Sequence, residues 1–238
     1  IPIKKKMTLK ELKPNLYSLP NQPNAIPYIT SYYSKKWGFC LKHKQLTKLK
    51  NKKYEVCINS NFKKGEMNYG EVIIPGKSRD EILLSTNICH PSMGNNETSG
   101  MVVTSALIRW ITSIKNPYFT YRIIFIPETI GSIAYLNLHK KHLKKRVKAG
   151  FVIVCVGDNK KFSFLESKEA NTLADKAALY VLNNFVKKFD YYDFLERGSD
   201  ERQYCSPGID LPICSIMRSK YGTYPEYHTS LANLNFIS

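Results

Sequence analysis

Three short apolar runs, each the length of one β-strand, constrain the fold of this chain most. They lie at residues 82–86, 121–127 and 151–156. Strands that are apolar on both faces are typical of a parallel sheet with helices on either side. Segments with helical periodicity alternate with these runs, at residues 99–114, 130–138 and 173–185. This alternation predicts an α/β fold, a three-layer sandwich with a mainly parallel central sheet.

The first 80 residues follow a different pattern. Residues 1–36 contain five prolines, so we expect a short helix near residues 9–12 followed by an extended arm. Residues 54–60 and 69–75 have the pattern of two strands joined by a hairpin turn around Gly65. We therefore expect an N-terminal arm with a small, inserted β-rich region over residues 1–80, and the α/β core over residues 81–238.

The chain is strongly basic, with a net charge of +17. Its lysines are scattered, many of them in Lys-Lys pairs, and no basic motif interleaved with aromatic residues gathers them. Charge alone supports only non-specific association. We therefore expect a generally basic surface and no specific nucleic-acid partner. No run of 18 apolar residues occurs, so the sequence also predicts no membrane span.

The six cysteines argue for a reducing compartment. They stand at positions 40, 57, 89, 155, 205 and 214, and none forms a Cys-x-x-Cys pair. Several lie inside apolar runs, which is typical of buried free thiols. We expect a cytoplasmic protein without a disulfide framework or a zinc finger. The oligomeric state is left open by the sequence.

Three loops at predicted strand ends carry residues that could act chemically. In α/β sheets the ligand crevice lies at the carboxyl ends of the strands. This rule singles out His90 after the first buried strand, Glu128 after the second, and His228 near the end of the chain. Two imidazoles and a carboxylate form a ligand set of catalytic zinc sites, which leave one position for water.

Each of these residues also has a purely structural explanation. His90 could be hydrogen-bonded in a loop that Asn96 or Thr98 caps at a helix start. Glu128 could be a carboxylate in the first turn of a helix, where the helix dipole favours it. His228 could be packed among aromatic side chains. Taken singly, none of the three predicts a metal.

Four longer stretches carry a resemblance that covers nearly the whole chain. They are residues 26–33 with 37–40, residues 89–93, residues 126–135 and residues 197–208. They resemble a bacterial group of aminopeptidase-like proteins. The motifs at His90 with residues 96–100, at Glu128 with residues 131–132 and at residues 227–229 resemble the wider co-catalytic zinc aminopeptidase clan, which includes bacterial leucyl aminopeptidases and glutaminyl cyclases. The resemblance implies a zinc-exopeptidase-like fold and a chain truncated at both ends.

The resemblance also implies roles for particular residues. His90 and His228 would be metal ligands, and Glu128 would be either a ligand or the neighbouring general base. Asn96 stands where the clan has an aspartate that bridges two metals, and Ser199 with Asp200 resembles a Ser-Asp pair that lines the clan's site. A neutral amide is a poor bridge between two cations. We therefore expect one zinc ion rather than two.

Two further departures from the clan bear on the site. Pro127 occupies one place of the clan's Glu-Glu pair, and Asp158 is displaced from the position of the aspartate after the third strand. We expect the single zinc to be held by His90, Glu128 and His228, with Asn96 or Asp200 completing the shell.

The leading functional prediction is a zinc-dependent aminopeptidase-like hydrolase. It would cleave an amide or peptide bond next to a free amine in a small molecule or short peptide. Glu128 would shuttle the proton if it is not a ligand, Asp200 or Glu201 would hold the amine, and Tyr227 would line the pocket. The alternative is a catalytically degenerate module that binds a small amine or amino sugar. A nucleic-acid binder is a third alternative that rests on charge alone.

Overall fold

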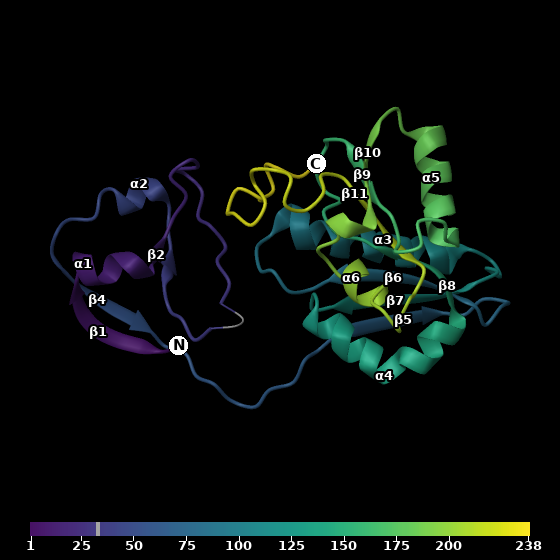
Figure 1. Cartoon of the computed structure of the whole chain (residues 1–238), viewed down its shortest axis with the longest axis horizontal. Helices are drawn as coiled ribbons and strands as arrows, with labels where there is room; N and C mark the ends of the chain where they lie inside the picture. Colours follow the sequence, from purple (N-terminus) through teal and green to yellow (C-terminus); the bar gives the residue numbers. More distant parts are fainter. Residues whose placement is uncertain (32–33) are drawn as a thin grey trace. The chain divides into compact units, whose positions relative to one another are not determined.

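The computed structural model describes residues 1–31 and 34–238, which form two compact units (Figure 1). Unit 1 comprises Ile1–Glu66 and Glu226–Ala232, and unit 2 comprises Met67–Pro225 and Asn233–Ser238. Tyr32 and Tyr33, which belong to the first stretch that carries the resemblance, lie outside the described residues. No helix in the described part of the chain is long and apolar enough to cross a membrane.

Unit 2 is built on a seven-stranded sheet in the order β10-β9-β11-β8-β6-β7-β5. The strands are β5 (Gly70–Ile74), β6 (Glu81–Asn87), β7 (Thr120–Ile126), β8 (Val147–Val152), β9 (Phe162–Leu165), β10 (Phe189–Tyr192) and β11 (Ile213–Met217). The four central strands, β7, β6, β8 and β11, are parallel to one another. β5 pairs antiparallel with β7, and β9 pairs antiparallel with β11. The predicted α/β fold is confirmed, with a sheet that is mixed rather than parallel throughout.

Helices cover both faces of this sheet, as Figure 1 shows. They are α3 (Ser99–Ser113), α4 (Ile130–Arg146), α5 (Leu173–Phe185) and α6 (Glu201–Tyr204), with the short helices η2 (Gly94–Thr98) and η3 (Phe194–Glu196). Two apolar clusters, beneath α3 and α5, both include Ile82 and Phe151, so these helices share one face. On the opposite face, Tyr204 of α6 bonds to Ser85 at 2.8 Å, and Tyr135 of α4 bonds to Arg122 at 3.2 Å. The two helical layers explain why the central strands are apolar on both sides.

The hairpin expected around Gly65 does not form. β4 (Lys53–Ile58) pairs antiparallel with β1 (Ile3–Thr8), whereas β5 adds to the outer edge of β7. Each pairing brings together apolar side chains, Met7 with Tyr54 in the first and Val72 with Ile123 in the second. Residues 67–80, which we expected in the N-terminal region, therefore belong to unit 2.

Unit 1 has a small core of its own. Besides β1 and β4 it contains α1 (Leu9–Leu12), η1 (Lys13–Asn15), β2 (Leu16–Tyr17), β3 (Phe39–Cys40) and α2 (His43–Leu46). Met7, Leu12 and Val56 are buried together at its centre. The late segment Glu226–Ala232 belongs to this unit because its backbone bonds to residues 26–28, with the amide of Tyr28 donating to the carbonyl of His228 at 2.8 Å.

Candidate metal site

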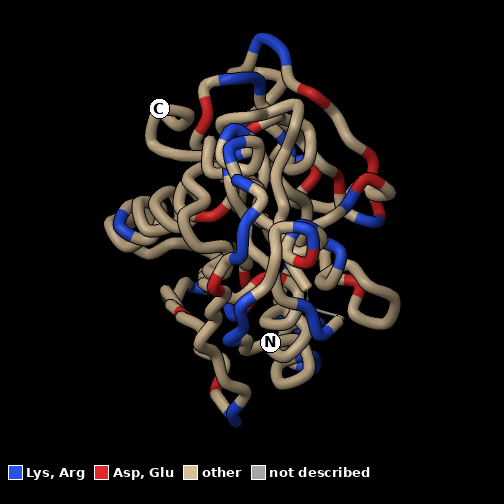
Figure 2. The backbone as a smooth tube through the Cα atoms, turned by 90° about the vertical axis from the view of Figure 1, so that its left-hand side faces the viewer, with Lys and Arg blue, Asp and Glu red and all other residues tan. Residues whose placement is uncertain are grey.

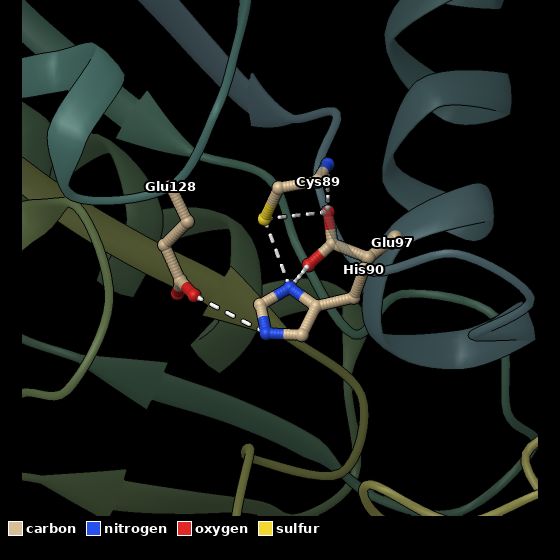
Figure 3. Close-up of side chains that lie close together, drawn as sticks. All are labelled: Cys89, His90, Glu97 and Glu128. Carbon is tan, nitrogen blue, oxygen red and sulfur yellow. Dashed lines mark hydrogen bonds and ion pairs between the residues drawn. The ribbon is translucent and has the colours of Figure 1, made fainter. Parts of the chain in front are cut away.

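The candidate site of unit 2 lies where the parallel strands β6 and β7 end. The loop after β6 carries Cys89 and His90, η2 carries Glu97, and Glu128 follows β7 by two residues (Figure 3). One potential ligand atom from each of these four side chains lies within 4.8 Å of the others. The carboxyl-end rule for α/β sheets therefore predicted the correct edge for His90 and Glu128.

His90 is held between two carboxylates. Its Nδ1 lies 2.8 Å from Oε1 of Glu97, and its Nε2 lies 3.8 Å from Oε2 of Glu128. The side chains of His90 and Glu97 are 5% and 2% exposed. An acceptor at Nδ1 favours the tautomer that carries the proton there, which directs the lone pair of Nε2 toward Glu128. Metal-binding histidines commonly have such a carboxylate at the ring nitrogen that does not bind the metal.

Burial and neighbouring charges shift the pKa values of this cluster. Burial by itself lowers the pKa of His90, but the hydrogen bond and charge of Glu97 outweigh it, so the net shift is upward. Burial raises the pKa of Glu128, against the opposing effect of its bond from Ser199. Burial, helped by the charge of Glu97, raises the pKa of Cys89 to about 12, so this thiol stays protonated near neutral pH.

Ser199 and Asp200, in the segment before α6, form hydrogen bonds with the turn that carries Glu128. The hydroxyl of Ser199 donates to Oε1 of Glu128 at 2.6 Å. Oδ1 of Asp200 accepts from the amide of Thr129 and from the hydroxyl of Ser132, both at 2.8 Å. Thr129 has φ 63° and ψ −68°, a strained conformation for a β-branched residue. Two hydrogen bonds accepted by one carboxylate oxygen thus stabilise the turn that presents Glu128.

The two acidic residues predicted to hold a substrate amine are buried. Glu201 is 0% exposed, and its carboxylate accepts from the amides of Gly198 and Ser199 and from the hydroxyls of Tyr221 and Ser215. Asp200 is also 0% exposed, and burial raises its pKa to about 7. The contact of either residue with a substrate stays a prediction.

Both polar atoms of the Asn96 side chain form hydrogen bonds within the protein. Its Nδ2 donates to Oε1 of Glu97 at 2.6 Å, and its Oδ1 accepts from the thiol of Cys155 at 3.6 Å. Cys155 lies beyond β8, which ends at Val152, four residues earlier than the predicted strand. The displaced Asp158 accepts from Nδ2 of Asn95 at 3.0 Å.

His228 and Tyr227 belong to unit 1, where their rings stack at a centroid distance of 3.9 Å. His228 has φ 52°, and its ring meets the ring of Tyr28 in an edge-to-face arrangement with a centroid distance of 5.3 Å. The proposed roles of His228 as a ligand and of Tyr227 at the substrate stay predictions from the sequence.

Sequence reasoning missed Cys89, Glu97 and the contact of Ser199 with Glu128. Glu97 looked like part of a helix start because it stands beside Asn96 and Thr98. The available signal was a carboxylate seven residues after His90 in the same loop. The π-helical turn at Gly94–Thr98 directs this carboxylate back toward the imidazole.

The donor chemistry of His90 and Glu128 fits a zinc ion. Zinc is bound by imidazole nitrogen and carboxylate oxygen at roughly 2.0–2.2 Å, and Nε2 of His90 and Oε2 of Glu128 are near enough to share such an ion. Asn96 presents an amide that already has two partners.

Comparison with known proteins fixes the family. A model of a domain of unknown function, DUF4910, matches residues 14–238. The chain belongs to the DUF4910 family. A curated relative from Clostridium acetobutylicum is described as a candidate polysaccharide biosynthesis protein with an aminopeptidase-like domain. It is 42% identical over the whole of this chain, which spans 54% of that protein.

Solved structures extend this comparison to the fold. A candidate peptidase from Clostridium acetobutylicum covers 100% of the chain with a TM-score of 0.95 and 42% identity, and the chain covers 56% of it. A zinc aminopeptidase from Bacillus subtilis aligns with 71% of this chain over 44% of its own length, with a TM-score of 0.57 and 17% identity. A glutaminyl cyclase from Porphyromonas gingivalis aligns with 72% of this chain over 70% of its own length, with a TM-score of 0.54 and 16% identity. The predicted resemblance to zinc aminopeptidases and glutaminyl cyclases is confirmed at the level of the fold.

Proposed function

We propose that this DUF4910 chain is a zinc-dependent aminopeptidase-like hydrolase that cleaves an amide or peptide bond next to a free amine. The observation that carries the proposal is the position of His90 between Glu97 and Glu128. Its Nδ1 is bonded to one carboxylate and its Nε2 faces the other. The aminopeptidase-like fold is the context in which such a pair is expected to act.

His90 and Glu128 would hold the zinc ion, and Glu97 would keep the imidazole in the ligating orientation. The chemistry that zinc supplies in such sites is activation of water and polarisation of a carbonyl. If Glu128 is not a ligand, its raised pKa suits it to take a proton from water and pass it to the leaving amine. Ser199 would fix the carboxylate for either role.

The hydrogen bonds of the Asn96 side chain favour one zinc ion over two. Its amide nitrogen points at Glu97 and its oxygen accepts from Cys155. His228 would complete the metal shell, as the sequence predicts, and Asp200, Glu201 and Tyr227 would contact the substrate. The six free cysteines support a cytoplasmic location.

The description of the similar Clostridium protein supports a proposal for the substrate class. Because that protein is described in terms of polysaccharide biosynthesis, we propose that the free amine and the scissile amide belong to an amino sugar or a short peptide joined to a glycan. The amide of Asn96 replaces the bridging aspartate of the clan and is hydrogen-bonded within the protein. This replacement favours a second candidate function, a degenerate module that binds such an amine without turnover.

Metal analysis of the purified, zinc-supplemented chain tests the site. We expect one equivalent of zinc per chain, and less than a tenth of that in His90→Ala. His142→Gln is the matched control, because His142 lies on α4 and contacts Glu81 instead of the cluster. Two equivalents, or none, would contradict the single-site proposal.

A panel of aminoacyl and amino-sugar amides separates the two functions. Turnover that requires zinc supports the hydrolase, whereas calorimetric binding without turnover supports the degenerate module. Glu128→Gln then distinguishes the two roles of Glu128. Loss of zinc identifies a ligand, and loss of turnover with zinc retained identifies the proton shuttle.

A further inference from the structure

The positive charge of the chain is concentrated in unit 1. Its 73 residues hold fifteen lysines, no arginine and four glutamates, a net charge of +11. Unit 2 has more than twice as many residues and contributes only +6 of the total of +17. Figure 2 marks the basic and acidic positions along the backbone. The charge that looked scattered in the sequence therefore belongs mainly to one compact unit.

The lysines of unit 1 are exposed and unpaired with acids. All fifteen are exposed, and none has its ammonium nitrogen within 4.0 Å of a carboxylate oxygen among residues 1–31 and 34–238. In unit 2, by contrast, Lys148, Lys161 and Lys168 each pair with an aspartate. The charges of unit 1 are thus available to an external partner.

The two-stranded ribbon of β1 and β4 gathers three of these lysines on one face. Met7 and Val56 point into the small core, so the alternate positions point outward. The outward positions are Lys4, Lys6 and Thr8 on β1 and Lys53, Glu55 and Cys57 on β4. Lysines on exposed edge strands also prevent unwanted strand pairing. That role does not explain the lysines on α1 and on the loop between α2 and β4.

We propose that unit 1 binds an acidic polysaccharide through this lysine face, which consists of Lys4, Lys6 and Lys53 with the neighbouring lysines of unit 1. Lysine is a point charge that attracts any dense anion, whereas arginine provides the forked geometry that pairs bidentately with a single carboxylate, phosphate or base edge. The outward positions carry no aromatic residue on which bases could stack. The helices α1 and α2 have four residues each, too few to read a major groove.

A flexible polymer that carries regularly spaced carboxylates matches this set of properties better than nucleic acid does. The choice of a polysaccharide rests on the proposed function, in which the amide substrate is attached to a glycan. The lysine face would then retain an anionic polymer near the enzyme, independently of the metal site.

Binding of the whole chain to a polyuronate, to neutral dextran and to a duplex DNA oligonucleotide tests the proposal. The variant K4E/K6E/K53E is compared with K140E/K141E/K187E, which changes three exposed lysines of unit 2 and therefore has the same net charge. We expect the first variant to lose about tenfold or more of the polyuronate affinity, and the second to lose about twofold. Dextran should not bind.

Equal losses in the two triple variants would show that binding follows net charge alone and would overturn the proposal. Tighter binding of DNA than of polyuronate at about 200 mM salt would overturn it in favour of nucleic acid. The variant K4Q/K6Q/K53Q introduces no negative charge and is therefore less prone to misfold. It should also bind polyuronate more weakly than K140E/K141E/K187E does. His90→Ala should bind polyuronate normally, so failure of the metal site and failure of the lysine face are distinguishable.

Discussion

The backbone amide of Thr129 donates a 2.8 Å hydrogen bond to Oδ1 of Asp200, a residue 71 positions later in the chain. The same oxygen accepts from Ser132. Oδ2 of Asp200 is buried without a hydrogen-bond partner among the described residues. Because Thr129 follows Glu128 and has a strained backbone, the bond that its amide donates to Asp200 links the segment before α6 to the orientation of Glu128.

Replacing Asp200 should change how stability depends on pH. Burial raises the pKa of Asp200 from 3.8 to about 7. The folded state therefore keeps a proton that the unfolded state has lost between these values, and stability falls as the pH rises from about 4 to about 7. In zinc-free Asp200→Asn this component, on the order of 3 kcal/mol, should be absent.

Urea unfolding at pH 4.5, 5.5 and 7 measures this difference. Asp190→Asn is the control, because Asp190 lies at the surface beside Lys161. Parallel stability curves for the native protein and Asp200→Asn would contradict the assigned pKa shift.

Replacing Glu97 should weaken zinc binding although Glu97 is not among the predicted ligands. Its carboxylate holds Nδ1 of His90 at 2.8 Å, and loss of such outer partners typically lowers metal affinity about 10–100-fold. We expect Glu97→Ala to fall in that range and Glu97→Gln, which keeps an acceptor oxygen, to fall at its lower end. Competition with a chromophoric chelator measures the affinity. Equal affinities of Glu97→Ala and an exposed control, Glu55→Gln, would refute the orienting role.

Two ion pairs at similar distances should differ greatly in their effect on stability. Arg122 donates to Glu81 at 2.7 Å with side chains 8% and 5% exposed, whereas Lys168 meets Asp210 at 2.6 Å with 36% and 39% exposed. Glu81→Gln leaves a buried guanidinium without its full countercharge and should cost about 3 kcal/mol of unfolding free energy. Asp210→Asn should cost less than about 1 kcal/mol.

The cost of Glu81→Gln should also depend on pH. Burial opposes ionisation of Glu81, but Arg122 and His142 outweigh it and hold the pKa below its ordinary 4.5. The stabilisation is therefore present above pH 4.5 and is lost as the pH falls through the lowered value. Urea unfolding at pH 7 and near pH 3 measures the change, and an effect of Glu81→Gln that grows on acidification would contradict it.

A methyl group at Gly100 should disturb the contact between α3 and the sheet. A Cβ there would lie 2.4 Å from the carbonyl oxygen of Ile153 and 2.5 Å from Oγ1 of Thr86. We expect Gly100→Ala to lower the unfolding free energy by about 2 kcal/mol or more. Gly65→Ala, where nothing lies within 4 Å, should change it by less than about 0.5 kcal/mol. Thermal unfolding of the two variants side by side measures the contrast.

The sequence predicted those helices and strands that are determined by residues close together in the chain. Thr172 caps α5, and the Asp175 side chain completes the capping box within the same turn. The apolar run at residues 82–86 lies within β6 because burial on both faces requires such a run. β9 and β10 were missed because each has only four residues, and their pairing with β11 and with one another is long-range.

The sequence by itself determined the α/β class and the position of His90 and Glu128 at one edge of the sheet, because nearby residues determine which strands are buried and where each strand ends. Only the tertiary structure decided that Glu97, and not Asn96, meets the imidazole of His90. It also decided that Asp200 stabilises the turn at Thr129, and that β4 and β5 pair with different partners. Such contacts depend on the direction of a side chain and on the packing of segments far apart in the chain, which residue order and periodicity do not specify.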